Sequence, residues 1–460
     1  MSGTFAVVAP ANSILRVLPK CDAFILRAVI FLSLQEDWDS HMTEKRKPKF
    51  FYGYIIVSAS IITTAVMWGT LYSFGVFFKP MLTEFGWTRA ATSAAYSFCI
   101  LLSAFLSIIM GRLTDRFGPR LVIRICGFSL GLGYLLMSQI NAVWQLYVLY
   151  GVMVGIGISG AYAPLLATVG RWFIKRRGMM TGIASAGGAV GAMTIPPIVG
   201  WLISVYDWRT SYIITGIVAL LLVVLAAQFL KRDPSQIGVL PYGGEQTSEN
   251  GAELQASSFS VHEAMHTRQF WLLCAVFTCN LLPLSAMVVH VVVHAIGLGV
   301  LPTSAANIMA FMGIGGIVGR ITLTSAADKV GNKLAMIIGF ILMAVTFIWL
   351  MAAKEVWMLY LFGFVFGFAS HSLIALIALS TVELFGLGSL GVLLGAVNSG
   401  GAIGEGIGPV LAGGIFDITG SYQGTFLLLL AISVTGIILS SLLRRTDKLS
   451  LVPTSTPTRN

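Results

Sequence analysis

Charged residues are scarce in this sequence. Of its 460 residues only 10% are charged and 56% are hydrophobic, whereas an average soluble domain has about 25% charged residues. No soluble core could bury that much apolar surface, so the composition excludes an ordinary soluble protein and favours a lipid bilayer. The 19 acidic residues are outnumbered by 29 basic ones. The basic residues fall in short clusters between apolar runs, which is typical of membrane-protein loops and not of a nucleic-acid-binding face.

Cysteines and catalytic motifs are also scarce. The five cysteines mostly lie inside apolar runs without metal-type spacing, and we interpret them as packing residues: Cys21, Cys99, Cys126, Cys274 and Cys279. His290 and His294 share a helix face, but no third ligand joins them, which favours a gate or packing role over a metal site. We find no phosphate-binding loop and no nucleophile with a neighbouring base. The sequence predicts neither an enzyme nor an ATP-driven pump, and no cofactor or metal.

Twelve apolar runs are long enough to cross a bilayer, which takes about 20 helical residues. Six lie near residues 52–78, 92–113, 121–140, 143–170, 179–203 and 212–230. Six more lie near 270–297, 303–326, 334–352, 357–380, 388–413 and 424–443. The sequence predicts an all-α membrane protein with 12 transmembrane helices in two six-helix bundles. The expected parts are an N-terminal bundle, a cytoplasmic linker, a C-terminal bundle and a cytoplasmic tail, over residues 42–230, 231–269, 270–446 and 447–460.

The first 41 residues differ from the rest. Their apolar run from Ala23 to Leu34 is interrupted by Arg27, is too short to span a bilayer and lacks a small-residue cleavage site. Met42 is followed by a basic segment directly before the first span. We therefore interpret Met42 as the start, and residues 1–41 as an upstream or disordered extension.

The distribution of basic residues predicts the orientation. They gather in the loops that follow even-numbered spans: Arg112, Arg116, Arg120, Arg171, Lys175, Arg176, Arg177, Lys329 and Lys333. The opposite loops carry fewer, each with an acidic residue nearby. Because basic loops stay inside, we expect both termini to be cytoplasmic in a multi-pass protein of the inner or plasma membrane.

The two halves repeat one motif. Asp115-Arg-Phe-Gly-Pro-Arg120 recurs as Asp328-Lys-Val-Gly-Asn-Lys333 at the same place in the second half. Such a repeat implies two homologous bundles related by an axis along the membrane normal, with a substrate site at mid-membrane between them. A receptor with a single binding site does not need two homologous bundles, whereas a carrier whose bundles move about a site between them does.

The segment Gly111-Arg-Leu-Thr-Asp-Arg-Phe-Gly-Pro-Arg120 resembles the signature loop of the major facilitator superfamily. A second segment, Arg171-Trp-Phe-Ile-Lys-Arg-Arg-Gly-Met-Met-Thr-Gly-Ile-Ala-Ser-Ala-Gly-Gly188, is similar to one in monocarboxylate transporters and their bacterial oxalate/formate-antiporter relatives. The resemblance covers about residues 42–446 and is nearest to bacterial proton-coupled lactate transporters. It implies a conformational role for five residues of the repeated loops: Asp115, Arg116, Arg120, Asp328 and Lys329.

Arg320 is the first candidate for substrate binding. It follows Gly313-Ile-Gly-Gly-Ile-Val-Gly well inside the eighth span, where an arginine costs about 2.5–3.5 kcal/mol and is retained only if paired or functional. The glycines leave room for a ligand or for a close helix. Guanidinium binds a carboxylate through two parallel hydrogen bonds, and in the resembled family the arginine at this position binds the substrate carboxylate. The alternative is an interfacial arginine that reaches the cytoplasm.

Four further polar residues are candidates for the cavity. Tyr72 and Tyr162 match polar positions of the first and fourth spans in the resembled family. Each phenol can donate a hydrogen bond to a carboxylate or hydroxyl. The alternative is that each aromatic ring fills a helix interface. Asn280 and Asn398 are weaker candidates in the seventh and eleventh spans.

Two residues are candidates for carrying a coupled proton. His371, in the tenth span, can also contact substrate, or can merely bond a neighbouring helix. Glu405 is the acid deep in a predicted helix, and it can neutralise Arg320 in the empty carrier, carry the proton, or serve as a structural partner. The resemblance departs at Gly316, where animal members have an aspartate one turn before the arginine, and at Phe51-Tyr-Gly-Tyr54, which replaces their first-span motif. A copied proton-coupling scheme therefore does not transfer directly.

These observations predict a secondary carrier of small monocarboxylates such as lactate, with proton symport, functional as a monomer in a lipid bilayer. The nearest alternative is an oxalate/formate-type antiporter. A non-transporting membrane sensor with the same fold is a third alternative, but it predicts extra signalling sequence that the short linker and tails do not offer.

Overall fold

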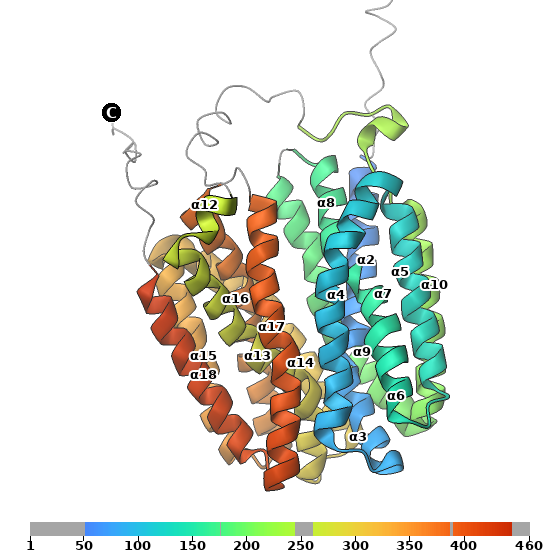
Figure 1. Ribbon diagram of the computed structural model, residues 1–460, viewed down its shortest axis with the longest axis vertical. Coiled ribbons are helices and arrows are strands. Elements are labelled where there is room, and N and C mark those ends of the chain that lie inside the picture. Colours follow the sequence, from blue (N-terminus) through green and yellow to red (C-terminus); the bar gives the residue numbers. More distant parts are fainter. Residues whose placement is uncertain (1–50, 175, 244–260, 387–389, 444–460) are drawn as a thin grey trace, which may run out of the picture. The chain divides into compact units, whose positions relative to one another are not determined.

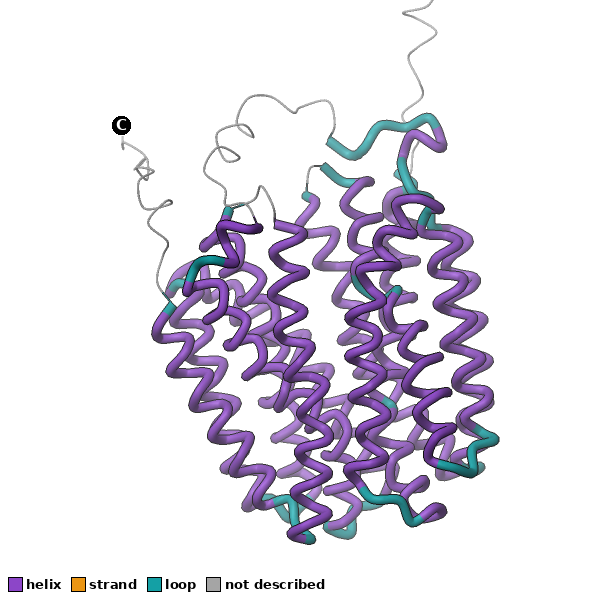
Figure 2. The backbone as a smooth tube through the Cα atoms, in the orientation of Figure 1, coloured by secondary structure: helices purple, strands orange, loops and turns teal. Residues whose placement is uncertain are grey.

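The computed structural model describes residues 51–174, 176–243, 261–386 and 390–443, and nearly all of them are helical (Figure 1, Figure 2). The predicted extension 1–41 with its proposed start at Met42, Lys175 and the predicted tail 447–460 lie outside the described residues.

The first half contains the helical segments that build spans one to six. They are α2 (Gly53–Tyr72), α3 (Phe74–Phe85), α4 (Arg89–Phe117), α5 (Pro119–Met137), α6 (Val143–Leu146), the π-helical η1 (Tyr147–Val154), α7 (Gly155–Ser159), α8 (Ala163–Trp172), α9 (Arg177–Val205) and α10 (Trp208–Phe229). A short 3₁₀ turn, η2 (Pro234–Ile237), and α12 (Val261–Met265) lie in the predicted linker.

The second half contains six long helices. They are α13 (Arg268–Gly297), α14 (Pro302–Val330), α15 (Asn332–Ala352), α16 (Val356–Phe385), α17 (Leu390–Thr419) and α18 (Gln423–Leu442). Among the described residues, 11 helical stretches are long and apolar enough to cross a membrane. The further helix, α17, has 30 residues and is rich in glycine, and it carries the two acids Glu405 and Asp417. The predicted architecture of two six-helix bundles is confirmed.

The helices extend beyond the predicted apolar runs because their polar ends are capped. The second span was expected near 92–113, but α4 begins at Arg89, directly after Thr88, whose side chain accepts a hydrogen bond from the Ala91 amide. At its other end α4 stops at Gly118, which has a φ of 84°. Sequence hydropathy locates the membrane core of each helix, whereas capping decides where the helix ends.

The repeated loop motif has the same backbone shape in both halves. Gly118 and Gly331 end α4 and α14 with φ angles of 84° and 87° and ψ angles of 158° and 147°. These angles are accessible essentially only to glycine, which explains why each copy of the motif has glycine at that point.

Packing within each half follows one scheme. Helix α2 packs on α9 as α13 packs on α17; α5 packs on α10 as α15 packs on α18; and α4 packs on the α7 segment as α14 packs on α16. The sequence repeat is therefore a repeat of tertiary structure, as expected for the two bundles.

In the part of the chain that the structure describes, the two halves pack together mainly through α4 with α17, α3 with α13, and α9 with α14. We call the end of the bundle that contains α3 the α3 end, at the bottom of Figure 1, and the opposite end the α12 end. At the α3 end Gly200 of α9 lies against Ala306 of α14, because a Cβ on Gly200 would stand 2.5 Å from the Ala306 Cβ.

The contact between α2 and α9 tests this packing. A Cβ at Gly191 would stand 2.0 Å from the Ala65 carbonyl oxygen, so Gly191→Ala should push the two helices apart and cost about 1–3 kcal/mol by overpacking. Gly182→Ala on the same helix is the matched control, because nothing lies within 4 Å of its Cβ and alanine favours the helix. Thermal unfolding in detergent should show a lower Tm for Gly191→Ala alone. Equal Tm values for the two variants would contradict the close α2–α9 packing.

Candidate functional site

Arg320 lies on α14 between the two halves. Part of the surface of its side chain is accessible, although protein atoms surround the guanidinium. Its Nε atom is buried and has no hydrogen-bond partner among the described residues. The phenols within electrostatic reach, Tyr72 and Tyr162, both belong to the other half. Within the described ranges no carboxylate lies within ion-pair distance of this guanidinium. These contacts place Arg320 toward the first half and argue against the interfacial alternative.

The glycines that precede Arg320 admit neighbouring helices. Cβ atoms at Gly315 and Gly319 would stand 2.0 Å and 2.3 Å from carbonyl oxygens of α16. A Cβ at Gly313 would stand 2.7 Å from the Met193 amide nitrogen of α9, across the contact between the halves. Of the two explanations considered for this glycine run, the close approach of helices is the one observed.

Tyr72 and Tyr162 both lie at breaks in their spans. Tyr72 is the last residue of α2, before the chain bends at Ser73 into α3. Tyr162 precedes α8 in the turn Gly160–Tyr162, which Pro164 follows, and 46% of its surface is accessible although protein surrounds it. A side chain that is accessible at such depth faces an internal space. Broken helices at membrane depth are tolerated where they line such a space.

Tyr72 connects the cation and the acid of the site. It lies within electrostatic reach of Arg320 and of Glu405 on α17. Glu405 also acts on Tyr96 and Cys99 of α4, so its carboxylate faces the first half. In the described part of the chain no ion pair joins Glu405 to Arg320. Of the three roles considered for Glu405, the neutralisation of Arg320 is therefore not made in this conformation.

His371 lies directly over Gly316, one turn before Arg320. A Cβ at Gly316 would stand 2.9 Å from the imidazole Cγ, so the ring fills the space of a side chain at this position. Its Nδ1 lies 3.1 Å from the Gly367 carbonyl oxygen, which can only accept, so Nδ1 carries the hydrogen and the neutral ring keeps a lone pair on Nε2. That Nε2 atom is buried without a partner. A second proton on this ring would place another positive charge beside Arg320.

The two asparagines are placed differently. Asn280 is fully buried on α13; its Nδ2 donates to the Ser370 carbonyl oxygen at 3.1 Å, and its Oδ1 has no partner. Ser370 adjoins His371, so Asn280 belongs to the same cluster. Asn398 is exposed on α17, and nothing in the described residues connects it with Arg320. The structure thus gathers Asn280 with the other candidates but not Asn398.

The loop residues are paired in the first half. Asp115 forms an ion pair with Arg171 at the end of α8. The Arg116 guanidinium lies 5.2 Å from the Phe117 ring centre, and Arg120 Nε donates to Gln228 Oε1 at 3.0 Å.

The corresponding loop of the second half is built differently. The segment Glu383-Leu-Phe385 aligns there with Arg171-Trp-Phe173 at nearly the same offset, so an acid stands in place of Arg171. For Asp328 and Lys329 the described residues show no ion pair.

A second group of polar residues joins the halves at the α3 end: Arg89, Asp417, Tyr422 and His290. Sequence reasoning missed the first three, because Arg89 and Asp417 lie 328 positions apart and only the fold brings them together. His290 was expected to have a gate or packing role, and both of its ring nitrogens are hydrogen-bonded to protein atoms.

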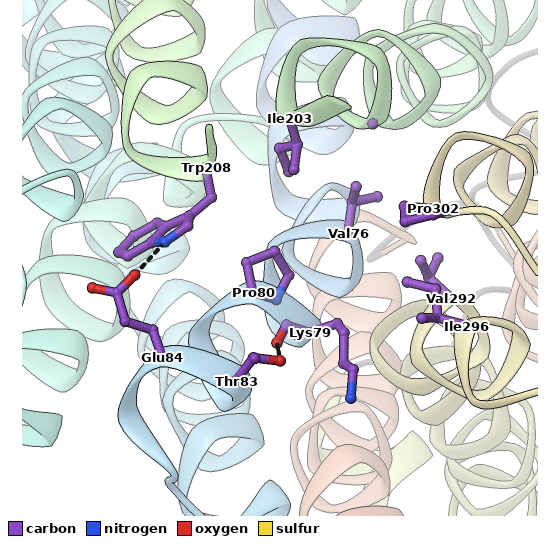
Figure 3. Close-up of a pocket in the computed structure, with 11 residues that line it drawn as sticks. Val76, Lys79, Pro80, Thr83, Glu84, Ile203, Trp208, Val292, Ile296 and Pro302 are labelled. Atoms are coloured by element: carbon purple, nitrogen blue, oxygen red, sulfur yellow. Dashed lines mark hydrogen bonds between the residues drawn. The ribbon is translucent and has the colours of Figure 1, made fainter. Parts of the chain in front are cut away.

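A cavity of about 360 Å³ also lies at the α3 end (Figure 3). Both halves line it, for example with Val76 and Gly200 from the first and Val292 and Pro302 from the second. Its walls are mainly apolar, and Arg320 and the other predicted site residues are not among its lining residues. We therefore take the cluster around Arg320, and not this cavity, as the candidate substrate site.

The cluster around Arg320 has a defined chemistry. It combines one unpaired cation, two phenols, and two buried acceptor atoms on Asn280 and His371. Buried polar atoms are nearly always hydrogen-bonded in proteins. The unpartnered acceptors therefore call for a hydrogen-bond donor, and the guanidinium calls for an anion. A small organic anion that also carries a hydroxyl group matches this set.

The chain is similar to known transporters. The family model for the Major Facilitator Superfamily matches residues 60–332 and 296–458. Monocarboxylate transporter 13 of Rattus norvegicus is 29% identical over 86% of this chain and 89% of that protein. The oxalate:formate antiporter of Oxalobacter formigenes is 25% identical over 49% of this chain and 50% of that protein.

Solved structures support the same fold. A bacterial homolog of the human lysosomal transporter Spinster matches with a TM-score of 0.62 and 15% identity, covering 86% of this chain and 95% of that one. Together with the duplicated six-helix architecture and the glycine-ended loop motif, these matches show that the chain is a multi-pass membrane transporter, not an enzyme, and belongs to the major facilitator superfamily.

Proposed function

We propose that the protein is a secondary active transporter of small monocarboxylates of the lactate and pyruvate class, working by alternating access with proton symport. The observation that carries this proposal is Arg320, a guanidinium between the two halves without an acidic partner within ion-pair distance among the described residues. The similarity to monocarboxylate transporters supports it.

The expected orientation is part of this proposal. The basic loop residues lie at the α12 end, which makes that end cytoplasmic by the positive-inside rule and the α3 end the outer one. We place the protein in the cell membrane with both termini inside, acting as a monomer.

Charge balance favours a monocarboxylate over a dicarboxylate. A buried carboxylate without a compensating cation is costly, and Arg320 compensates one. Helix α17 contains no Lys or Arg, and its ionisable groups, Glu405 and Asp417, have the opposite sign. The alternative, an oxalate/formate-type antiporter, is favoured by the similarity to the Oxalobacter protein, but here a dianion would leave the site negative.

A coupled proton removes the electrical cost of anion entry. Moving one negative charge inward against the membrane potential costs about 2.3 kcal/mol per 100 mV, and a proton carried with each carboxylate cancels it. Glu405 is the better of the two candidates for carrying this proton. No cation in the described residues lies within ion-pair distance of its carboxylate, whereas His371 lies beside the positive Arg320.

The first prediction concerns the anion site. Arg320→Gln should lower kcat/KM for uptake about 100-fold, because losing a charged two-pronged hydrogen bond costs about 2–3 kcal/mol. Arg320→Lys should restore little, since an ammonium cannot form the fork. Arg268→Gln, the same change at an exposed position on α13, is the control. Transport by Arg320→Gln at half the wild-type rate or better, with normal membrane insertion, would show the binding role to be wrong.

The second prediction concerns coupling. Wild-type uptake should increase as the external pH falls, and substrate should draw protons inward. Glu405→Gln should keep counterflow exchange of labelled substrate but lose accumulation driven by a proton gradient, because a permanently neutral side chain cannot release a proton. If Glu405→Gln accumulates substrate normally and His371→Gln does not, the proton site is the imidazole. A substrate-induced current without alkalinisation outside would contradict proton symport.

The third prediction separates the two transport classes. In proteoliposomes that take up labelled lactate from outside, unlabelled lactate and pyruvate should compete at lower concentrations than oxalate or malonate. The reason is that one guanidinium balances one carboxylate. Stronger competition by oxalate than by lactate or pyruvate would put the antiporter alternative first.

A further inference from the structure

The two halves are hydrogen-bonded to each other at the α3 end through Asp417. Its carboxylate, at the end of α17, accepts the backbone N–H groups of Arg89 and Ala90 at 3.0 Å and 2.8 Å. These amides begin α4 in the other half, where the unsatisfied N–H groups and the helix dipole favour a negative charge. Asp417 is therefore a helix cap supplied by the opposite half.

Arg89 makes a second connection at the same place. Its guanidinium carbon lies 3.4 Å from the centre of the Phe416 ring, and its Nη1 donates a hydrogen bond to the Tyr422 hydroxyl. A cation stacked on an aromatic face and bonded to a phenol is held on two sides. The contact joins the two halves at the α3 end in this conformation, and the alternating access proposed above requires that it break.

His290 continues this network into the second half. Its Nε2 lies 2.9 Å from the Pro409 carbonyl oxygen and its Nδ1 lies 2.9 Å from the Tyr422 hydroxyl. A carbonyl only accepts, so Nε2 carries the hydrogen, and in the neutral ring Nδ1 must accept from the Tyr422 O–H. Burial raises the pKa of Tyr422 to about 12, so this phenol keeps its proton. The result is a directed chain from Arg89 through Tyr422 to His290.

A second proton on His290 is incompatible with this chain. Nδ1 would become a donor, so two cationic donors would face the Tyr422 oxygen and the hydroxyl hydrogen would lose its acceptor. The charged groups that act on His290 are Arg89 of α4 and Asp417 of α17. Asp417 already caps α4, so the new positive charge would chiefly repel Arg89.

The remaining neighbours of His290 offer no anion. His294, one turn further along α13, lies edge-on to the stacked Tyr422 and Phe426 rings, and the Phe78 ring of α3 lies edge-on 5.2 Å from His290.

We propose that His290 is a proton-responsive residue of the outer gate, whose protonation from outside loosens the contact between Arg89 and Tyr422 and shifts the carrier toward its outward-open state. The inference rests on the orientation and alternating access proposed above. This protonation of His290 is distinct from the proton proposed to cross with substrate. It controls how readily the outer side opens, and it does not change the number of protons transported with each substrate.

The experiment measures outer opening without any substrate. Val292, fully buried on α13, lines the cavity between the halves, so Val292→Cys in a background with the native cysteines changed to Ser reports exposure of that cavity (Figure 3). Labelling by a membrane-impermeant maleimide is compared at about pH 7.5 and about pH 5.5, on either side of the usual histidine range. Labelling of Leu298→Cys, an exposed position at the end of α13, measures how the reaction of a thiol with maleimide itself depends on pH. The labelling of Val292→Cys is divided by this value.

Three variants of the gate give distinct results. With wild-type His290 the corrected labelling should rise severalfold at the lower pH. With His290→Gln it should stay low at both, because the amide can accept from Tyr422 and donate to Pro409 but cannot gain a proton. With Tyr422→Phe it should be high at both, since the chain is cut. His294→Gln is the matched control and should keep the wild-type response.

Two outcomes would overturn the inference: a wild-type protein whose corrected labelling does not change with pH, or a His290→Gln variant that keeps the full change. Because no substrate is present, neither outcome depends on whether the protein transports monocarboxylates. Conversely, failure of lactate uptake with an intact labelling response would affect only the proposed substrate.

Discussion

A positive charge held between two apolar bundles is the constraint on which the rest of the site depends. The Arg320 guanidinium has no acid within ion-pair distance among the described residues, and the function proposed above assigns bound substrate as its partner. The features around it fit this assignment. Glycines let α16 and α9 close around α14, and breaks in the spans bring Tyr72 and Tyr162 to the same region. Such an unpaired charge is expensive in a membrane, and function is the ordinary reason for keeping it.

The polar contacts at the two ends of the bundle connect different parts of the protein. At the α3 end, a carboxylate from one half caps a helix of the other, and a cation is stacked on an aromatic ring. At the α12 end of the first half, Asp115 pairs with Arg171 within one half and is largely exposed, an arrangement worth about 0–1 kcal/mol. The links within the bundles can persist through a cycle, whereas those between the bundles must form and break.

The two halves share a duplicated helical scaffold, and they differ in the residues of the candidate site. Both halves share helix packing and the glycine-ended loop, yet Glu383 replaces the counterpart of Arg171, and Arg320, His371 and Glu405 all belong to the second half. The first half contributes phenols and the second half contributes the charged groups. Under the proposed function, such a carrier would bind its anion mainly through the second bundle.

The sequence by itself determined the helix count, the repeat, the family resemblance and Arg320 as a candidate, because hydropathy, spacing and the cost of a buried charge are properties of the chain. Only the tertiary structure decided which residues meet. Gly316 has no side chain because the His371 ring occupies its space, and these residues lie 55 positions apart. Asn398 and Asn280 look alike in sequence, yet one is exposed and the other buried beside Ser370. The contacts of Arg89 with Asp417 and Tyr422 were not predictable, since they join opposite halves and no local pattern records them.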